Sequence, residues 1–340
     1  MKRYNQHINN KGIALILTLI IIGIIVVLSL QFNTSMMSEL YSSTNLDNEI
    51  SLGSIAESGV EFALALLSAD DIKNIDHLME DWALASEYSK DSDALFEEGS
   101  FDVEIIDLCS MIPVNNLITY SGVSMTPKVN QGLMIVLKRL LKYSDPDIED
   151  FEADKIVHTL IDWIDTDQDA YGTSDGITPE NWTYQDMVPF PNESMKSLTE
   201  LLNINGIDEK ILFDISPQLT LEDNGGKINV YTANEHVLYA LFGIQPDEPE
   251  VKLIKDFIED RTDELYLEDI NNDPNWYRIW IPSYYPPPDE STAIITTKSS
   301  YFQISSIGKK VPAQRGVQGV VKRDSTSSPA KLTMESWEVI

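Results

Sequence analysis

The longest apolar run of the chain lies near its amino terminus and predicts a helix that could cross a membrane. From Ile13 to Leu30, only one threonine, one glycine and one serine interrupt the apolar side chains. With a rise of about 1.5 Å per residue, a helix over this run would extend about 27 Å. The hydrocarbon core of a bilayer is about 30 Å thick. We therefore predict a membrane-spanning segment over residues 13–32.

The residues before this run are basic and place the amino terminus in the cytoplasm. The segment 1–12 carries Lys2, Arg3 and Lys11 and no acidic residue. Because positively charged flanks stay on the cytoplasmic side, the rest of the chain is predicted to lie on the opposite side. A secretory signal peptide has a similar start, but its apolar region is shorter and a cleavage site of small residues follows. The sequence Leu-Ser-Leu-Gln-Phe-Asn from residue 28 lacks that site, so we predict a retained anchor.

Beyond the anchor, the pattern stays helical but becomes amphipathic. No proline interrupts residues 34–67, and apolar side chains recur at Ala56, Val60 and Ala63. Residues three and four apart lie on the same face of a helix. The simplest interpretation is one helix of more than 50 residues over 13–68, apolar all round in its first half and amphipathic in its second.

Three later segments predict strands. Residues 99–108 alternate between polar and apolar, with Phe101 and Val103 on one face. Residues 301–308 and 314–323 predict two further strands, and the short connection between them is compatible with a hairpin. Because strands from the two ends of a chain commonly pair, we expect one small sheet that contains all three.

The middle of the chain is mainly helical and reads as an insertion into that sheet. Helices are predicted over residues 132–143, 154–164, 197–203, 208–216, 233–242 and 249–261. The fold class is therefore α+β, with the long helix packed on a small antiparallel sheet. The sheet domain is predicted over residues 69–118 and 286–324, the helical insertion over 119–285 and a tail over 325–340. Residues 276–288, rich in aromatic residues and proline, predict a loop back to the sheet.

Charge and cysteine content narrow the functional classes. Fifty-five acidic against 24 basic residues give a formal net charge of −31. This balance excludes a general affinity for nucleic acid, which requires clustered Lys and Arg. It also repels anionic lipid headgroups, so membrane attachment must be hydrophobic. The single cysteine, Cys109, cannot form an intrachain disulfide, and the four histidines are scattered singly. No residue pattern leads us to predict an enzyme.

The leader ends in Lys11-Gly12 directly before the apolar run, and this arrangement resembles that of type IV prepilins. The resemblance implies that a prepilin peptidase cleaves between Gly12 and Ile13 on the cytoplasmic side and leaves the helix in place. It also implies that Ile13 becomes a methylated amino terminus. In type IV prepilins the fifth residue after the cleavage site is glutamate. Counted from Ile13, that residue is Leu17 in this chain.

The replacement of that glutamate suggests a position in the filament. A carboxylate within the apolar layer is costly unless it meets a cation. The resemblance implies that the glutamate meets the amino terminus of the neighbouring subunit and so sets the register of the filament. Leu17 has no charge to neutralise. The subunit therefore needs no neighbour above it, and we predict that it occupies the filament tip.

Four further segments, in order and spread over most of the chain, resemble the minor pseudopilins of the GspK family of type II secretion. These segments are Ile55-Ala-Glu-Ser-Gly-Val-Glu, Leu160-Ile-Asp-Trp-Ile-Asp-Thr-Asp, Ser197-Leu-Thr-Glu-Leu-Leu-Asn-Ile-Asn-Gly-Ile and Gly226-Lys-Ile-Asn-Val-Tyr-Thr-Ala-Asn-Glu-His-Val-Leu. The resemblance implies a pilin fold with a large helical insertion and a role in starting the pseudopilus. It also implies a tip complex with the I-type and J-type minor pseudopilins, contact with the major pseudopilin, and processing by the prepilin peptidase. The expected location is the inner membrane, crossed once, with the bulk of the chain in the periplasm.

An acidic cluster predicts a calcium site. Five aspartates crowd together at Asp162, Asp165, Asp167, Asp169 and Asp175. A hard divalent cation relieves the repulsion between close carboxylates. An EF-hand is excluded, because its sixth and twelfth positions would be Ala170 and Gly176. The resemblance implies a structural calcium ion just after the Asp-Trp-Ile-Asp motif, held by Asp165, Asp167, Asp169 and Asp175, with Glu180 as a further candidate. A solvated acidic turn, in which Asp162 caps a helix end, is the alternative.

Two other functions stay open at this point. A minor pilin of a type IV pilus would share the leader, but it usually keeps the glutamate and carries a pair of cysteines near the carboxyl end, and this chain has neither. A membrane-anchored periplasmic protein, either a calcium-binding protein or a hydrolase, would need a pocket with convergent polar groups. The position of the mature amino terminus separates the prepilin interpretations from the latter.

Overall fold

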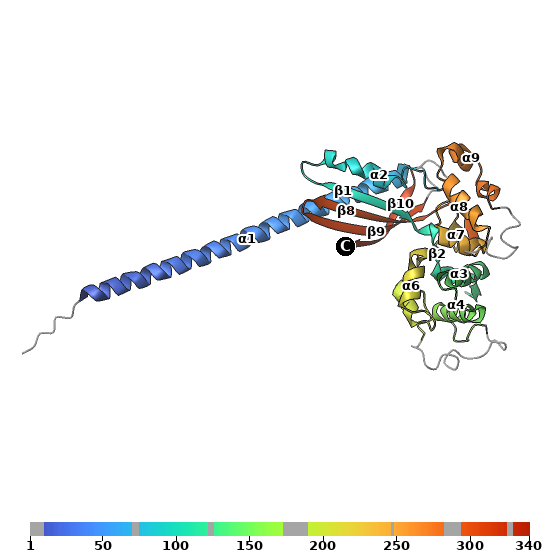
Figure 1. Cartoon of the computed structure of the whole chain (residues 1–340), viewed down its shortest axis with the longest axis horizontal. Coiled ribbons are helices and arrows are strands. Elements are labelled where there is room, and N and C mark those ends of the chain that lie inside the picture. Colours follow the sequence, from blue (N-terminus) through green and yellow to red (C-terminus); the bar gives the residue numbers. More distant parts are fainter. Residues whose placement is uncertain are drawn as a thin grey trace, which may run out of the picture.

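The computed structural model describes residues 10–69, 75–121, 126–172, 190–245, 248–281, 294–324 and 329–340. Its first element, α1 (Asn10–Ala69), is a single helix of 60 residues. The first part of α1 projects away from the rest of the protein, and its end packs on a sheet (Figure 1). The predicted long helix is confirmed, and it begins three residues earlier than expected.

A four-stranded antiparallel sheet receives the end of α1. Its strands lie in the order β1 (Ser100–Asp107), β8 (Tyr301–Lys310), β9 (Ala313–Asp324) and β10 (Lys331–Val339). Strand β1 pairs with β8 although about 200 positions of sequence separate them, for example at Ile105 and Ile304. The expected pairing of strands from the two ends of the chain is therefore confirmed, as is the predicted α+β fold class.

The helix lies very close to the sheet. Apolar residues of α1 join those of the strands in one core, including Ala56, Val60, Phe302 and Val317. A Cβ atom added to Gly308 of β8 would lie 2.5 Å from the carbonyl oxygen of Leu52 and 2.9 Å from the backbone nitrogen of Ala56. Glycine at this position lets the backbones of helix and strand approach each other.

Strand β10 was not expected, because residues 325–340 were predicted as a tail. A β-bulge shifts the pairing between Met334 and Ser336. The bulge moves the alternation of apolar side chains by one residue, so Leu332 and Met334 follow one phase along the sequence and Trp337 and Val339 the other. A simple period of two therefore does not reveal this strand.

A second, larger core belongs to the helices between the strands. These helices gather at the end of the sheet away from the projecting part of α1 (Figure 1). They are α3 (Gln131–Ser144), α4 (Asp150–Ile164), α6 (Glu209–Ile215), α7 (Glu235–Phe242), α8 (Val251–Asp260) and α9 (Leu267–Asn272). The segment predicted as a helix over 197–203 is the 3-10 helix η4 (Leu198–Asn203).

Several short elements complete the fold. Between α1 and β1 lie the short helices α2 (Ala85–Tyr88) and η1 (Ser89–Leu95). Among the described residues, three small two-stranded pairings lie within the insertion or join it to the flanking segments: β2 (Ile112–Pro113) with β5 (Leu219–Thr220), β3 (Ile118–Ser121) with β4 (Thr126–Val129), and β6 (Ile228–Asn229) with β7 (Ile295–Thr296). Of the predicted loop 276–288, Trp276 and Tyr277 are buried in the helical core, and residues 282–288 lie outside the described ranges.

Candidate assembly site: the anchor helix and the buried junction

The first part of α1 is an exposed apolar surface. The side chains of residues 12–47 are all exposed, and the best window of 18 residues has a mean hydropathy of 3.3. Apolar side chains exposed in this way, over this length, fit a bilayer or the helices of neighbouring subunits. Leu17 lies within this surface and is 57% exposed.

The predicted cleavage pair is exposed on the same helix. No atom lies within 4 Å of a Cβ built on Gly12, and Ile13 is 60% exposed. Residues 1–9 of the leader lie outside the described part of the chain. The peptide bond between Gly12 and Ile13 therefore has no packed neighbour among the described residues, and its processing remains a prediction.

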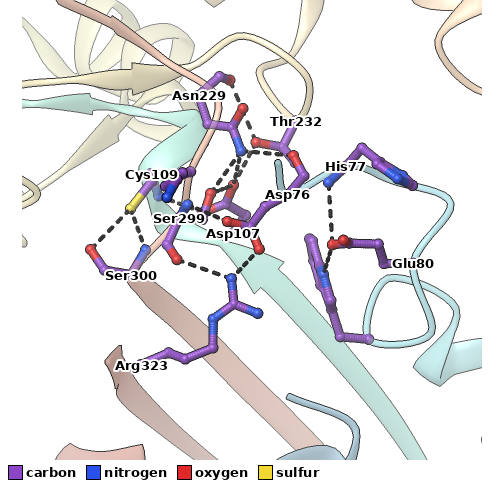
Figure 2. A network of polar contacts seen from close by, with 12 residues as sticks. Asp76, His77, Glu80, Asp107, Cys109, Asn229, Thr232, Ser299, Ser300 and Arg323 are labelled. Atoms are coloured by element: carbon purple, nitrogen blue, oxygen red, sulfur yellow. Dashed lines mark hydrogen bonds and ion pairs between the residues drawn. The ribbon is translucent and has the colours of Figure 1, made fainter. Parts of the chain in front are cut away.

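A buried ion pair joins the sheet to the segment that follows α1. Asp76 and Arg323 of β9 are both buried and form a salt bridge (Figure 2). The backbone nitrogen of Ser299 donates to the second oxygen of Asp76 at 2.6 Å, and Arg323 Nη2 donates to the Ser299 carbonyl at 3.1 Å. The Arg323 guanidinium also lies 4.6 Å from the centre of the Phe302 ring. These contacts fix three separate segments to one another.

A second carboxylate extends this junction into the helical insertion. Asp107, the last residue of β1, accepts hydrogen bonds from Ser299 Oγ and from Thr232 Oγ1, each at 2.5 Å. Asn229 of β6 donates to the Asp76 carbonyl at 3.0 Å and to Ser299 Oγ at 2.8 Å. Because Asn229 and Thr232 come from the insertion, the polar junction holds the insertion on the sheet (Figure 2).

Burial dominates the acid–base properties of the junction. It raises the pKa of Asp76 to about 6, although the adjacent Arg323 guanidinium acts in the opposite direction. It also raises the pKa of Asp107 despite the hydrogen bonds from Ser299 and Thr232. Burial beside Asp107 raises the pKa of the Cys109 thiol to about 12, so this thiol is a poor nucleophile. The hydrogen bonds and the ion pair of these groups join the segment after α1, the sheet and the insertion.

The acidic cluster follows α4. Asp162 is fully buried and accepts a hydrogen bond from the backbone nitrogen of Tyr171 at 2.7 Å. Asp165 is buried at the end of the helix, whereas Asp167 and Asp169 are exposed. Asp167 accepts from the backbone nitrogen of Asp169 at 2.9 Å. Asp162 therefore stabilises the turn after α4 from a buried position, and Asp165, not Asp162, is the last capping residue of the helix.

The described residues do not by themselves form a metal site. Among them, no three His, Cys, Asp or Glu side chains are grouped in a way that could hold an ion. Asp175 and Glu180, the other two predicted ligands, lie in the segment 173–189, outside the described ranges. The calcium site stays a prediction that depends on those two residues.

One formal match to a hydrolase motif lies beside this cluster. Residues 172–176 read Gly-Thr-Ser-Asp-Gly, which fits the G-x-S-x-G pattern. The hydrolase motif places its serine on a sharp turn between a strand and a helix. Here Gly172 follows α4 and an irregular turn rather than a strand, and Ser174 lies outside the described ranges. The match therefore gives no support to a hydrolase.

The polar junction was not predicted from the sequence. Its members come from five segments that are distant along the chain, so no local motif contains them. One signal was present. Asp107 and Arg323 occupy inward-facing positions, in phase with Phe101 and Val103 on β1 and with Val317 and Val321 on β9. A charged residue at an inward position of a strand indicates a buried partner.

Comparisons with known proteins agree with this architecture. The family described as "Type II secretion system (T2SS), protein K" matches residues 110–223. Type II secretion system protein K of Aeromonas hydrophila is 22% identical over 335 residues, which cover 92% of each chain. A chain in the crystal structure of the GspK-GspI-GspJ complex from enterotoxigenic Escherichia coli aligns with a TM-score of 0.55 and 16% identity. The alignment covers 88% of this chain and 99% of that one.

The three comparisons point to the same kind of protein. The family match begins just before the helical insertion and covers its first part, including α3, α4, the acidic cluster and α6. The curated relative extends the similarity over almost the whole chain, and the solved structure shares its fold. With an exposed apolar helix, an antiparallel sheet and inserted helices, the chain is similar to protein K of type II secretion systems in sequence, over residues 110–223 and against the Aeromonas hydrophila protein, and in fold.

Proposed function

We propose that this chain is a minor pseudopilin at the tip of the type II secretion pseudopilus. In this role it initiates filament assembly and supports the export of proteins from the periplasm across the outer membrane. The observation that carries the proposal is the combination of a projecting apolar helix with a pilin-like sheet and a large helical insertion. The role is structural, as is that of the family, and no catalysis is proposed.

The partners follow from the same architecture. The solved relative was crystallised in a complex with GspI and GspJ. We infer that this chain assembles with I-type and J-type minor pseudopilins and that the major pseudopilin lies below them. Leu17 supports the tip position, because an apolar residue there leaves no charge for a subunit above to neutralise. The bulk of the helical insertion would then point away from the membrane.

The anchor determines the proposed location. Residues 13–32 would cross the inner membrane once, with the basic leader in the cytoplasm and the sheet and insertion in the periplasm. The prepilin peptidase would act on the cytoplasmic side at Gly12. The helix is apolar and exposed enough for this role.

The mature amino terminus tests the proposal. We expect the protein from its native host to begin at Ile13, with the first 12 residues absent and the new terminus methylated. Intact-mass measurement and amino-terminal peptide sequencing would show this directly. A Gly12→Leu variant should remain at full length, because the peptidase is expected to require glycine at this position. A wild-type protein that keeps Met1 would contradict the proposal.

We also propose that the acidic cluster binds a structural calcium ion, on the basis of the crowded aspartates after α4. At a calcium concentration of about 100 times Kd, a bound ion stabilises the fold by about 2.7 kcal/mol. The melting temperature of the full chain in detergent micelles should therefore rise with calcium and fall after chelation. The paired variant Asp175→Asn and Glu180→Gln should lose this difference. Equal melting temperatures with and without calcium would exclude the ion.

The two other candidate functions are not favoured. The minor pilin of a type IV pilus has no match among the comparisons reported above, whereas the protein K family is found in all three. The anchored periplasmic protein would leave the match over residues 110–223 unexplained.

A further inference from the structure

One arginine in the helical insertion is buried without an acidic partner. Arg261 directly follows α8 and is 4% exposed. Its Nη1 atom donates a hydrogen bond to the Val230 carbonyl oxygen at 3.0 Å, and the guanidinium lies 5.5 Å from the centre of the Phe257 ring. Among the described residues, no Asp or Glu forms a salt bridge with it. Its positive charge is therefore not balanced by the described part of the chain.

One edge of this guanidinium is also unused. The Nε atom of Arg261 is buried and has no hydrogen-bond partner. The bond from Nη1 to Val230 is the one hydrogen bond that this side chain makes to a described residue, so Nη2 has no acceptor there either. The N–H of Nε and one N–H of Nη2 point in the same direction, and this pair matches the two oxygens of a carboxylate. The unused edge thus has the geometry of an oxyanion site.

A second buried arginine shows what is missing around the first. Arg323 is 3% exposed, donates to the Ser299 carbonyl and lies 4.6 Å from the centre of the Phe302 ring. Arg261 has the same kinds of contact, with one carbonyl oxygen and one phenylalanine ring. Arg323 also pairs with the carboxylate of Asp76 (Figure 2). The comparison indicates that Arg261 requires a carboxylate that the described residues do not supply.

The charge of Arg261 cannot simply be lost. Burial lowers the pKa of this guanidinium to about 10, which is still well above neutral pH. The carboxyl end of a helix carries a partial negative charge that favours a cation. However, no carbonyl oxygen of α8, all of whose residues are described, accepts a hydrogen bond from this side chain. A charge that is taken out of water without a counter-ion is costly, and a bound anion removes that cost.

We propose that Arg261 anchors a buried site for a small carboxylate anion, which Nε and Nη2 bind through its two oxygens. A small ion suits the burial of the site, because a bulky ligand would not reach a side chain that is 4% exposed. Nη1 stays bonded to Val230, the residue after β6. The bound anion therefore stabilises the packing of α8 against this segment, as Asp76 stabilises the junction through Arg323. The site does not depend on the place of the chain in a filament.

Formate, the smallest carboxylate, tests the site. The melting temperature of the full chain in detergent micelles is measured in sodium formate and in sodium chloride, at the same concentration and pH. Formate gives each of the two N–H groups an oxygen of its own, whereas a chloride ion has to be shared between them. A ligand that binds only the folded state stabilises it by mass action. We expect a melting temperature that is higher by at least about 3 °C in formate.

Substitutions assign the effect to one side chain. Arg261→Met removes the charge but keeps an apolar stem, so it should abolish the difference between the two salts. It should not lower the melting temperature in chloride, because an apolar side chain replaces a buried charge that has no partner. Arg261→Lys keeps the charge without the fork and should lose most of the difference. The matched control is Arg278→Met, at an exposed arginine of η7 (Trp276–Ile279), which should keep the full difference.

Saturation-transfer NMR provides a readout that does not depend on stability. After saturation of the protein signals, the formate proton should lose intensity in the presence of the wild-type chain or of Arg278→Met. The same experiment with Arg261→Met should leave the formate signal unchanged.

Three results would overturn the site. Equal melting temperatures of the wild-type chain in formate and chloride would show that no carboxylate binds. A difference that persists in Arg261→Met would place the ion elsewhere. A large loss of stability in Arg261→Met, equal in the two salts, would show that a group within the chain already balances the arginine.

Discussion

Replacing Arg323 by leucine is expected to lower the free energy of unfolding by about 3–5 kcal/mol at neutral pH, the usual cost of removing one partner of a buried ion pair. The change leaves the Asp76 carboxylate buried without the charge that balances it. It also removes the hydrogen bond to the Ser299 carbonyl and the contact with the Phe302 ring. Urea unfolding of the full chain in detergent micelles, followed by circular dichroism, would measure the loss.

The loss should be smaller in acid. The pKa of Asp76 is raised from 3.8 to about 6 in the folded protein, so the folded state binds the proton more tightly than the unfolded state. The contribution of this group to stability is full below about pH 3.8 and is lost as the pH rises through about 6. Without Arg323 the pKa of Asp76 rises further. We therefore expect the difference between variant and parent to shrink between about pH 7 and about pH 5.

A double variant separates the charge from the packing. Asp76→Asn keeps an acceptor for the Ser299 backbone nitrogen but removes the negative charge. In the presence of Arg323→Leu it should recover part of the lost stability, because no uncompensated charge then remains buried. If the effects of the two substitutions simply add, the two side chains do not interact and the ion pair is not what holds the junction.

Replacing Gly308 by alanine is expected to destabilise the protein by about 3 kcal/mol, at the upper end of the usual cost of overpacking. The added methyl group would meet backbone atoms of Leu52 and Ala56 at 2.5 and 2.9 Å. Backbone atoms within a helix cannot move aside as a flexible side chain can, so α1 would have to shift away from β8. Thermal unfolding would measure the loss, and limited proteolysis would show whether α1 has left the sheet.

Gly53 of α1 provides the matched control. It lies within the same helix, but a Cβ at this position would have only Arg315 Nη1 within 4 Å, at 3.8 Å. Gly53→Ala should therefore stabilise the helix by about 0.5–1 kcal/mol. Opposite signs for the two alanine substitutions are the expected result. Two variants of equal stability would show that the approach of helix to strand at Gly308 is not limited by the backbone.

The helices and strands predicted correctly from the sequence are those in which apolar residues recur at a regular spacing without interruption. Helix α1 was predicted because no proline breaks its pattern, and α3 and α4 because their apolar residues repeat at helical spacing. Buried and more exposed side chains alternate along β1, and they do so along β9 from Val317 onward. Strand β10 was not predicted, because its bulge interrupts the alternation of apolar and polar side chains. The hairpin of β3 and β4 was not predicted, because strands of four residues are too short to show an alternation of apolar and polar side chains.

The buried junction shows a different limit of sequence analysis. The sequence around Asp76, Asn229 and Ser299 shows no regular spacing of apolar residues. Their contacts join residues that are between 70 and 223 positions apart in the sequence. Only the tertiary fold brings them together. The family resemblance implied the helical insertion correctly, but it contained no information about how that insertion is held on the sheet.

The length of α1 between membrane and sheet has an electrostatic consequence. Leu52 is the first buried residue of the helix, so residues 33–51 separate the proposed membrane segment from the packed domain. As a helix, those residues extend about 28 Å. At physiological ionic strength, electrostatic interactions in water decay over about 8 Å. With residues 13–32 in the membrane as proposed, a domain that carries most of a net charge of −31 would stand more than three screening lengths from the anionic headgroups, where electrostatic repulsion between the two is weak.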